Sequence, residues 1–159
     1  MEYTTLGRTG LRVSVAGLGC GGNSRVGIGT GKSMAEAADV IRAALDRGVN
    51  YVDTARNYGT EPAVGLALNG RPRDEIVIST KSTIRVEGER ITPDLLVTHL
   101  DESLKLLGTE YVDVYYLHGV ALGDYEYARD VLVPAMLKQR DKGKFRHLGI
   151  TEPAANDPE

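Results

Sequence analysis

Three short apolar runs in this chain each lead directly into an ionisable residue, and those residues are Asp53, Lys81 and His118. The runs are rich in β-branched and aromatic residues and cover 51–52, 76–80 and 112–117. Helix-length amphipathic segments separate them, as expected where strands alternate with helices. Because the C-terminal ends of parallel strands in a strand–helix barrel face one shared mouth, we expect the three side chains to converge there. Tyr58, five positions after Asp53, is expected to join them.

The same alternation continues along nearly the whole chain. Residues 4–13 surround a glycine-bounded turn, which predicts a β-hairpin ahead of the repeat. The repeat is predicted to contain strands at 13–19, 51–53, 76–81, 112–118 and 145–151. Strands that alternate with helices indicate a parallel sheet with right-handed crossovers.

Capping signals mark where the first two helices begin. Ser33 and Glu36 form a capping box, and the helix that follows is predicted to end at Gly48. Its apolar face is predicted to consist of Val40, Ile41, Ala44 and Leu45. A second helix is predicted to open at Thr60-Glu61-Pro62, where the acidic residue in the first turn matches the helix dipole.

The third helix carries the clearest signals. Thr92 is its predicted N-cap, Pro93 its first residue and Gly108 its stop, and its apolar stripe comprises Leu96, Leu100, Leu104 and Leu107. A fourth helix is predicted to end near Gly143, with an apolar face of Val131, Leu132, Ala135 and Leu137.

The last residues indicate that the repeat continues beyond this chain. Asn156-Asp157-Pro158-Glu159 has the pattern of a helix opening, with Asp157 as N-cap. We therefore expect residues 1–159 to be one domain, truncated at its C-terminus: the front half of a larger barrel. The first and fifth strands would then be open edges, through which two copies are able to associate as a homo-oligomer.

Composition narrows the class of partner. The 159 residues carry a net charge of -3 and include one cysteine, Cys20. No basic cluster favours nucleic acid or an anionic membrane, and no disulfide within the chain is possible. Neither a signal peptide nor a membrane-spanning segment is evident. We expect a cytoplasmic protein that acts on a small molecule, with no nucleic-acid or membrane partner.

The four residues expected at the mouth suit carbonyl reduction. Tyrosine has an ordinary pKa of about 10, so its use as a proton donor needs a neighbour such as Lys81 that eases loss of the proton. Asp53 would pair with Lys81 and keep it charged. His118 would donate a hydrogen bond to a carbonyl oxygen while Tyr58 delivers the proton and a nicotinamide delivers the hydride.

These segments resemble the aldo-keto reductase family, in the right order and over essentially the whole chain. The family's motif of Asp-Thr-Ala, Tyr-Gly and Glu is similar to residues 53–61 here, and its lysine and histidine strands resemble Ser79-Thr80-Lys81 and Tyr116-Leu117-His118. Its opening and its fifth strand resemble the segments 6–11, 17–21 and 143–150.

The resemblance implies an α/β fold of the (β/α)8 TIM-barrel type, here only about the first five strand units after an N-terminal β-hairpin. It implies an NADP(H)-dependent oxidoreductase, with NAD(H) also open, that reduces an aldehyde, ketone or aldose.

The implied catalytic residues are Asp53, Tyr58, Lys81 and His118, and the implied cofactor-binding residues are Gly19, Cys20, Gly21, Asp53 and Thr151. Thr151-Glu152 departs from the Ser-Asn common in the family. The family's later strands and its 2′-phosphate segment have no counterpart in these residues.

Two other interpretations stay open. Residues 17–22 fit the G-x-G-x-x-G pattern of a dinucleotide-binding Rossmann domain, although the polar, glycine-rich stretch before Ser33 replaces the immediate helix that this fingerprint requires. We interpret that stretch as a loop over the barrel mouth.

A catalytically silent half-barrel or a regulatory nucleotide-binding relative, acting through protein association, is the alternative to an enzyme. Cys20 is more simply a small loop residue than a nucleophile, and Glu87–Arg90 is expected to be a solvated loop.

Overall fold

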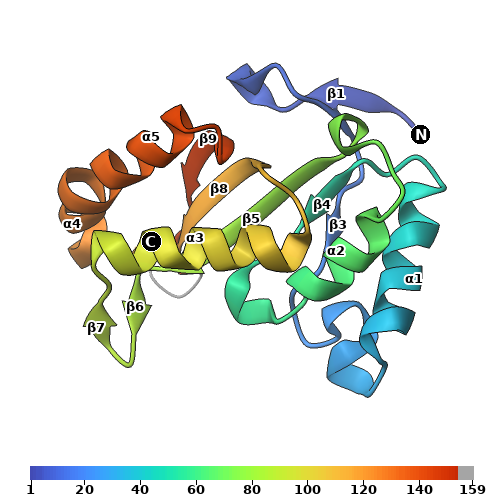
Figure 1. The fold of residues 1–159 in the computed structure, drawn as a ribbon, viewed down its shortest axis with the longest axis horizontal. Coiled ribbons are helices and arrows are strands. Elements are labelled where there is room, and N and C mark those ends of the chain that lie inside the picture. Colours follow the sequence, from blue (N-terminus) through green and yellow to red (C-terminus); the bar gives the residue numbers. More distant parts are fainter. Residues whose placement is uncertain (154–159) are drawn as a thin grey trace, which may run out of the picture.

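The computed structural model describes residues 1–153 and contains one parallel sheet of five strands in the order β3-β4-β5-β8-β9 (Figure 1). Its strands are β3 (Leu18–Gly19), β4 (Tyr51–Asp53), β5 (Val77–Thr83), β8 (Val112–His118) and β9 (Phe145–Ile150). Neighbours in the sheet follow one another along the chain, so each crossover leads to the next position. The order has no reversal point, and no helix opens at Gly22, so the Rossmann interpretation is wrong.

The helices and two small hairpins complete the fold. The helices are α1 (Met34–Leu45), α2 (Glu61–Leu68), α3 (Pro93–Leu107), α4 (Tyr125–Tyr127) and α5 (Val133–Asp141). The hairpin of β1 (Tyr3–Thr5) and β2 (Arg12–Ser14) lies at the end of the sheet where the strands begin, and that of β6 (Arg85–Val86) and β7 (Glu89–Arg90) lies at the opposite end (Figure 1). This arrangement is a partial (β/α) barrel with an N-terminal hairpin, as predicted.

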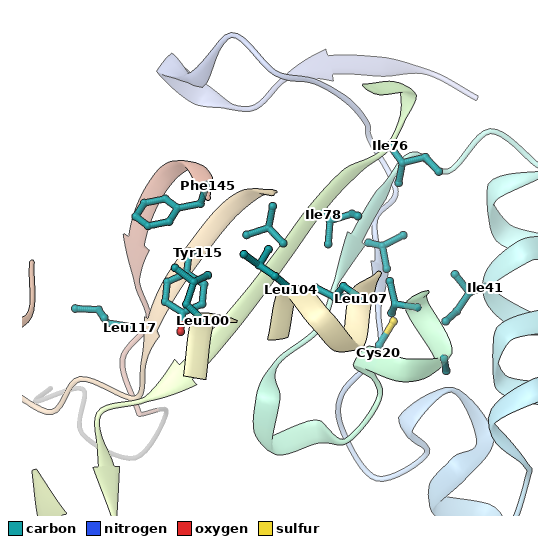
Figure 2. Packing of buried hydrophobic residues seen from close by; sticks show 14 of the residues in the cluster. Cys20, Ile41, Ile76, Ile78, Leu100, Leu104, Leu107, Tyr115, Leu117 and Phe145 are labelled. Carbon is teal, nitrogen blue, oxygen red and sulfur yellow. The ribbon is translucent and has the colours of Figure 1, made fainter. Parts of the chain in front are cut away.

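The core lies between the helices and the outer face of the sheet. Leu96, Leu100, Leu104 and Leu107 of α3 are buried, so the predicted stripe is confirmed. They belong to the same core as Ile78 of β5 and Leu117 of β8, and the ring of Tyr115 stacks on Phe145 with centroids 5.7 Å apart (Figure 2). Thr92 accepts a hydrogen bond from the amide of Leu95, and Gly108 ends α3 in a left-handed conformation, as predicted.

The first predicted strand is wrong in extent. Residues 13–19 were expected to form one strand, but they are divided between the hairpin strand β2 and the two-residue strand β3. The hydroxyl of Ser14 donates to the carbonyl of Ala16, and the Asn50 side chain accepts from the Ser14 amide. These bonds involve side chains rather than a neighbouring strand, so the chain bends after Ser14 before it joins the parallel sheet.

Two predicted helix faces need correction. Val40 is exposed, and the buried face of α1 consists of Ala37, Ala38, Ile41 and Leu45. Val131 is exposed as well, because a π-helical turn at Ala128–Leu132 precedes α5 and the buried residues follow the spacing Ala128, Leu132 and Met136. The capping box of Ser33 and Glu36 is present as predicted.

Residues 87–90 are exposed as expected, but they are not a plain loop, because Glu89–Arg90 pairs with Arg85–Val86 in the β6–β7 hairpin. Both Arg85 and Arg90 donate to the buried carboxylate of Asp124, which ties the hairpin to the segment after β8. The predicted helix opening at 156–159 lies outside the described residues.

Candidate active site

The register of the sheet staggers the three strand residues. Asp53 is level with Ser79, Lys81 with Tyr116, and Thr83 with His118. Lys81 therefore lies two positions beyond the residue that is level with Asp53, and His118 lies two positions beyond the residue that is level with Lys81. Such a stagger is expected in a sheet that curves toward a barrel. The long side chain of Lys81 spans this offset. The strand also continues past Lys81 to Thr83, so Lys81 is not the last residue of β5 as the sequence suggested.

Lys81 and Asp53 form the charged centre of the site. Lys81 Nζ lies 2.5 Å from Asp53 Oδ2 and donates to the carbonyl oxygen of Thr54 at 2.8 Å. The lysine side chain is 7% exposed and the aspartate side chain 32%. Ser79 donates to the other Asp53 oxygen at 2.5 Å. A buried ammonium is thus paired and hydrogen-bonded, as burial of a charge requires.

Tyr58 lies over this pair. It ends a short 3-10 turn, Arg56–Tyr58, that follows β4. Lys81 Nζ is 5.1 Å from the centre of its ring, and the ring of His118 meets it edge to face with centroids 5.9 Å apart. The four residues predicted to converge are therefore brought together.

The environment shifts the pKa values of Tyr58 and His118 in the directions that favour their neutral forms. Burial, followed by the Asp53 carboxylate, raises the pKa of Tyr58. The net shift of the Tyr58 pKa is upward, so the lowering expected from Lys81 does not outweigh burial and the Asp53 carboxylate. Burial, followed by the Lys81 ammonium, lowers the pKa of His118, which favours a neutral imidazole.

Thr151 holds His118 in place. Its hydroxyl lies 2.7 Å from His118 Nδ1 and accepts a hydrogen bond from the Gly119 amide at 3.0 Å. If the hydroxyl donates to Nδ1, the ring proton sits on Nε2, which is the tautomer that serves as a hydrogen-bond donor. The hydroxyl assigned to the cofactor from sequence thus contacts the histidine in this structure.

The segment after β3 lies beside Tyr58. The amide of Cys20 donates to the carbonyl of Asp53 at 2.8 Å. Its side chain is fully buried, and burial raises the pKa of the Cys20 thiol to about 12, so the thiol faces the core. A Cβ added to Gly21 would lie 2.7 Å from Tyr58 Cε2, whereas one added to Gly19 would meet nothing within 4 Å. Gly21 therefore packs on the tyrosine, and Gly19 presents bare backbone to open space.

Sequence reasoning gave no role in the site to the side chains of Ser79, Thr54 or Thr60. Ser79 precedes Lys81 by two positions, so strand alternation places both on the same face. The hydroxyls of Thr54 and Thr60 lie 2.8 Å apart and close the loop that carries Tyr58. The side chain of Thr60 therefore does not cap α2, although the helix does open there as predicted.

Among residues 1–153, no group of three histidine, cysteine, aspartate or glutamate side chains is placed to hold a metal ion. The described helices include none with the length and apolar character needed to span a membrane.

Comparison with known proteins identifies the family. The sequence model of the aldo/keto reductase family matches residues 17–158. L-galactose dehydrogenase from Arabidopsis thaliana is 32% identical over 157 residues, which cover 95% of this chain and 48% of that protein. Methylglyoxal reductase DkgB from Salmonella typhi is 38% identical over 113 residues, or 70% of this chain and 40% of that protein. The chain thus spans about half the length of the curated relatives it matches.

Solved structures agree with the sequence comparison. The holo form of aldo-keto reductase AKR11C1 from Bacillus halodurans superimposes with a TM-score of 0.78 at 30% identity, over 96% of this chain and 50% of that one. The thermostable aldo-keto reductase Tm1743, in complex with the inhibitor epalrestat, gives a TM-score of 0.77 at 28% identity, over 94% and 53%. The chain belongs to the aldo/keto reductase family.

Proposed function

We propose that this chain carries the proton-transfer residues of an NAD(P)H-dependent oxidoreductase that reduces a small carbonyl compound, an aldehyde, ketone or aldose, to an alcohol. The observation that carries the proposal is the position of the paired Lys81 ammonium, 5.1 Å from the centre of the Tyr58 ring, which His118 meets edge to face. Family membership supports nicotinamide-dependent carbonyl reduction in general. NADP(H) rather than NAD(H), and Tyr58 as the acid, are our assignments.

In this mechanism His118 binds the carbonyl oxygen and Tyr58 protonates it. A neutral His118 whose Nδ1 is bonded to Thr151 offers Nε2–H to the oxygen and orients the carbonyl. The hydroxyl proton of Tyr58 moves to that oxygen, and the phenolate left behind is stabilised by Lys81. Asp53 holds Lys81 in its position and keeps it charged throughout this step.

The raised pKa of Tyr58 fits the direction of reduction. A phenol that holds its proton at neutral pH is an acid ready to donate, and the negative charge develops on it only when the substrate oxygen takes the proton. The pair of Lys81 and Asp53 is a preorganised dipole for that charge, so little rearrangement is required during the reaction.

The backbone at the end of β3 supports our assignment of a nicotinamide site. A Cβ added to Gly19 would meet nothing within 4 Å, and Gly21 packs on Tyr58, so this backbone is accessible beside the proposed proton donor. Gly19, the backbone of Cys20, Gly21, Asp53 and Thr151 are the residues we assign to cofactor binding. When bound, this group supplies the hydride for the carbonyl carbon.

The test is turnover of NADPH and of NADH with a panel of aldehydes, ketones and aldoses, compared between wild type and Tyr58→Phe. We expect carbonyl-dependent oxidation of the nicotinamide by wild type and its near loss in the variant. Equal turnover by the two proteins contradicts the role of Tyr58. Nucleotide binding by a folded wild type that gives no turnover favours the regulatory alternative.

A further inference from the structure

Glu61 is a buried carboxyl group that the proposed reaction does not use. It occupies the first position of α2 and is 1% exposed, although an acidic residue at a helix start usually faces solvent. Burial raises its pKa, against the opposing effects of the Thr80 and Ser103 hydroxyls. A carboxyl in such a place is costly unless its hydrogen bonds are made, so its partners are the key to its role.

Glu61 accepts a hydrogen bond from Thr80, the residue that precedes Lys81 on β5. Thr80 Oγ1 donates to Glu61 Oε1 at 2.6 Å, and both residues are fully buried. Because side chains alternate along a strand, Thr80 points to the helices while Lys81 points to the active site. Glu61 in turn follows Tyr58 by three positions. This hydrogen bond therefore connects the start of α2, three residues after the phenol, to the strand that carries the ammonium.

Two further bonds hold the other parts of the same loop. Lys81 Nζ donates to the carbonyl of Thr54, which anchors the loop where it leaves β4. The bond between Thr54 and Thr60 closes the loop on itself. Neither of these two bonds attaches the start of α2 to β5. The bond from Thr80 to Glu61 makes that connection.

We infer that Glu61 is a positioning residue that acts through Thr80 to set the distance between the Tyr58 phenol and the Lys81 ammonium. The functional meaning of that distance rests on the proposed function, but the distance itself does not. Loss of the bond detaches the start of α2 from β5 and lets the Tyr58 ring move away from Lys81.

The test is the NMR spectrum of tyrosine-ring-labelled protein, in which Tyr58→Phe identifies the Tyr58 signals. Thr80→Val removes the donor at nearly constant volume, and Thr80→Ser restores it. We expect the Tyr58 signals to shift or broaden in the valine variant and to keep their wild-type positions in the serine variant. Thr98→Val, at an exposed position of α3, is the matched control and leaves the Tyr58 signals unchanged.

A second variant covers the case in which Thr80→Val does not fold because it leaves a buried carboxyl without its donor. Glu61→Met removes that carboxyl together with the bond, so no buried carboxyl is left without a donor and only the neutral Thr80 hydroxyl loses its partner. We expect the Tyr58 signals to be displaced in this variant too. Tyr58 signals at their wild-type positions in folded Glu61→Met overturn the inference and leave Glu61 with a purely structural role.

Kinetics separate this inference from the proposed function. Where wild type turns over, Glu61→Met is expected to lower kcat by up to about 10²-fold, the scale of a misplacement of about 1 Å, with KM little changed. The NMR readout needs no turnover. Unaltered activity of Tyr58→Phe would thus refute the proposed function, whereas unmoved Tyr58 signals in Glu61→Met refute the positioning role.

Discussion

Lys81 Nζ lies 2.5 Å from Asp53 Oδ2, and this contact joins two neighbouring strands at the mouth of the sheet. The lysine is almost fully buried while the aspartate keeps partial contact with solvent. The pair therefore serves both the stability of the sheet and the electrostatics of the site, and the two contributions are separable by substitution.

Asp53 and Lys81 are expected to be coupled in their effects on stability. Asp53→Asn strands a buried ammonium and should cost about 3 kcal/mol in the free energy of unfolding, the lower end for a broken buried pair because Asp53 is partly exposed. The double variant with Lys81→Met should be less destabilised than the sum of the two single variants, with a coupling of about 1–3 kcal/mol. Urea unfolding of all four proteins measures this cycle, and strict additivity contradicts the pairing.

Gly21 and Tyr58 offer a steric test of the proton donor's position. A Cβ at Gly21 would overlap the Tyr58 ring, so Gly21→Ala should displace the phenol and reduce turnover by about 10²-fold or more. Gly123→Ala is the matched control, because a Cβ there meets nothing within 4 Å. Equal activity of the two variants would show that the observed contact between Gly21 and Tyr58 does not set the position of the phenol.

Tyr58→Phe keeps the ring and removes only the hydroxyl. Loss of a general acid is expected to lower turnover by about 10²–10⁴-fold, with the affinity for nicotinamide nucleotide nearly unchanged. Steady-state kinetics and nucleotide titration on the same sample check both halves of this prediction. A variant that binds nucleotide far more weakly than wild type would place Tyr58 in cofactor binding instead.

His118 should make stability depend on pH in a known direction. In the folded protein the pKa of His118 lies below the ordinary value of about 6.5 that it has in the unfolded chain. Between the folded and the unfolded pKa, the unfolded chain therefore binds more protons than the folded protein. Stability from this group is therefore complete above about pH 6.5 and falls as the pH drops through that window. His99, whose pKa is lowered by burial, acts in the same direction. The difference between wild type and His118→Gln isolates His118. It should change between pH 7.5 and about 5 in urea unfolding, and a constant difference contradicts the assignment.

Cys20 is expected to be inert toward thiol reagents in the folded protein. Its side chain is fully buried, and the thiol has a pKa of about 12, so almost no reactive thiolate exists at neutral pH. Labelling should be slow under native conditions and fast in denaturant. Rapid labelling of folded protein would show that the segment after β3 opens readily.

The parts of the fold that local sequence encodes were predictable. The third helix carries its cap, first-turn proline and terminal glycine within its own residues, and α3 begins and ends where these signals place it. The strand ends at Asp53 and His118 were predictable for the same reason, since apolar runs stop there. Residues 13–19 were misassigned because their division depends on Asn50, which is distant in sequence.

The features that the sequence did not predict depend on contacts between different elements of the fold. Nothing in the periodicity of the fourth helix predicts the π-helical turn at Ala128–Leu132, and the buried face there includes Leu132 but not Val131. Glu61 has the sequence context of an exposed first-turn acid, and its burial follows from Thr80 on another element. The contact of Thr151 with His118 likewise joins the ends of β8 and β9.

The most direct test of the account is a titration of the purified chain with NADPH, with NADH in parallel, followed by nicotinamide fluorescence. Gly19→Ala is the informative variant, because its added Cβ meets no protein atom within 4 Å and should leave the fold intact. The account predicts saturable binding by wild type and much weaker binding by Gly19→Ala. Absence of binding by a folded wild-type sample would contradict the claim that these residues form a usable nicotinamide site.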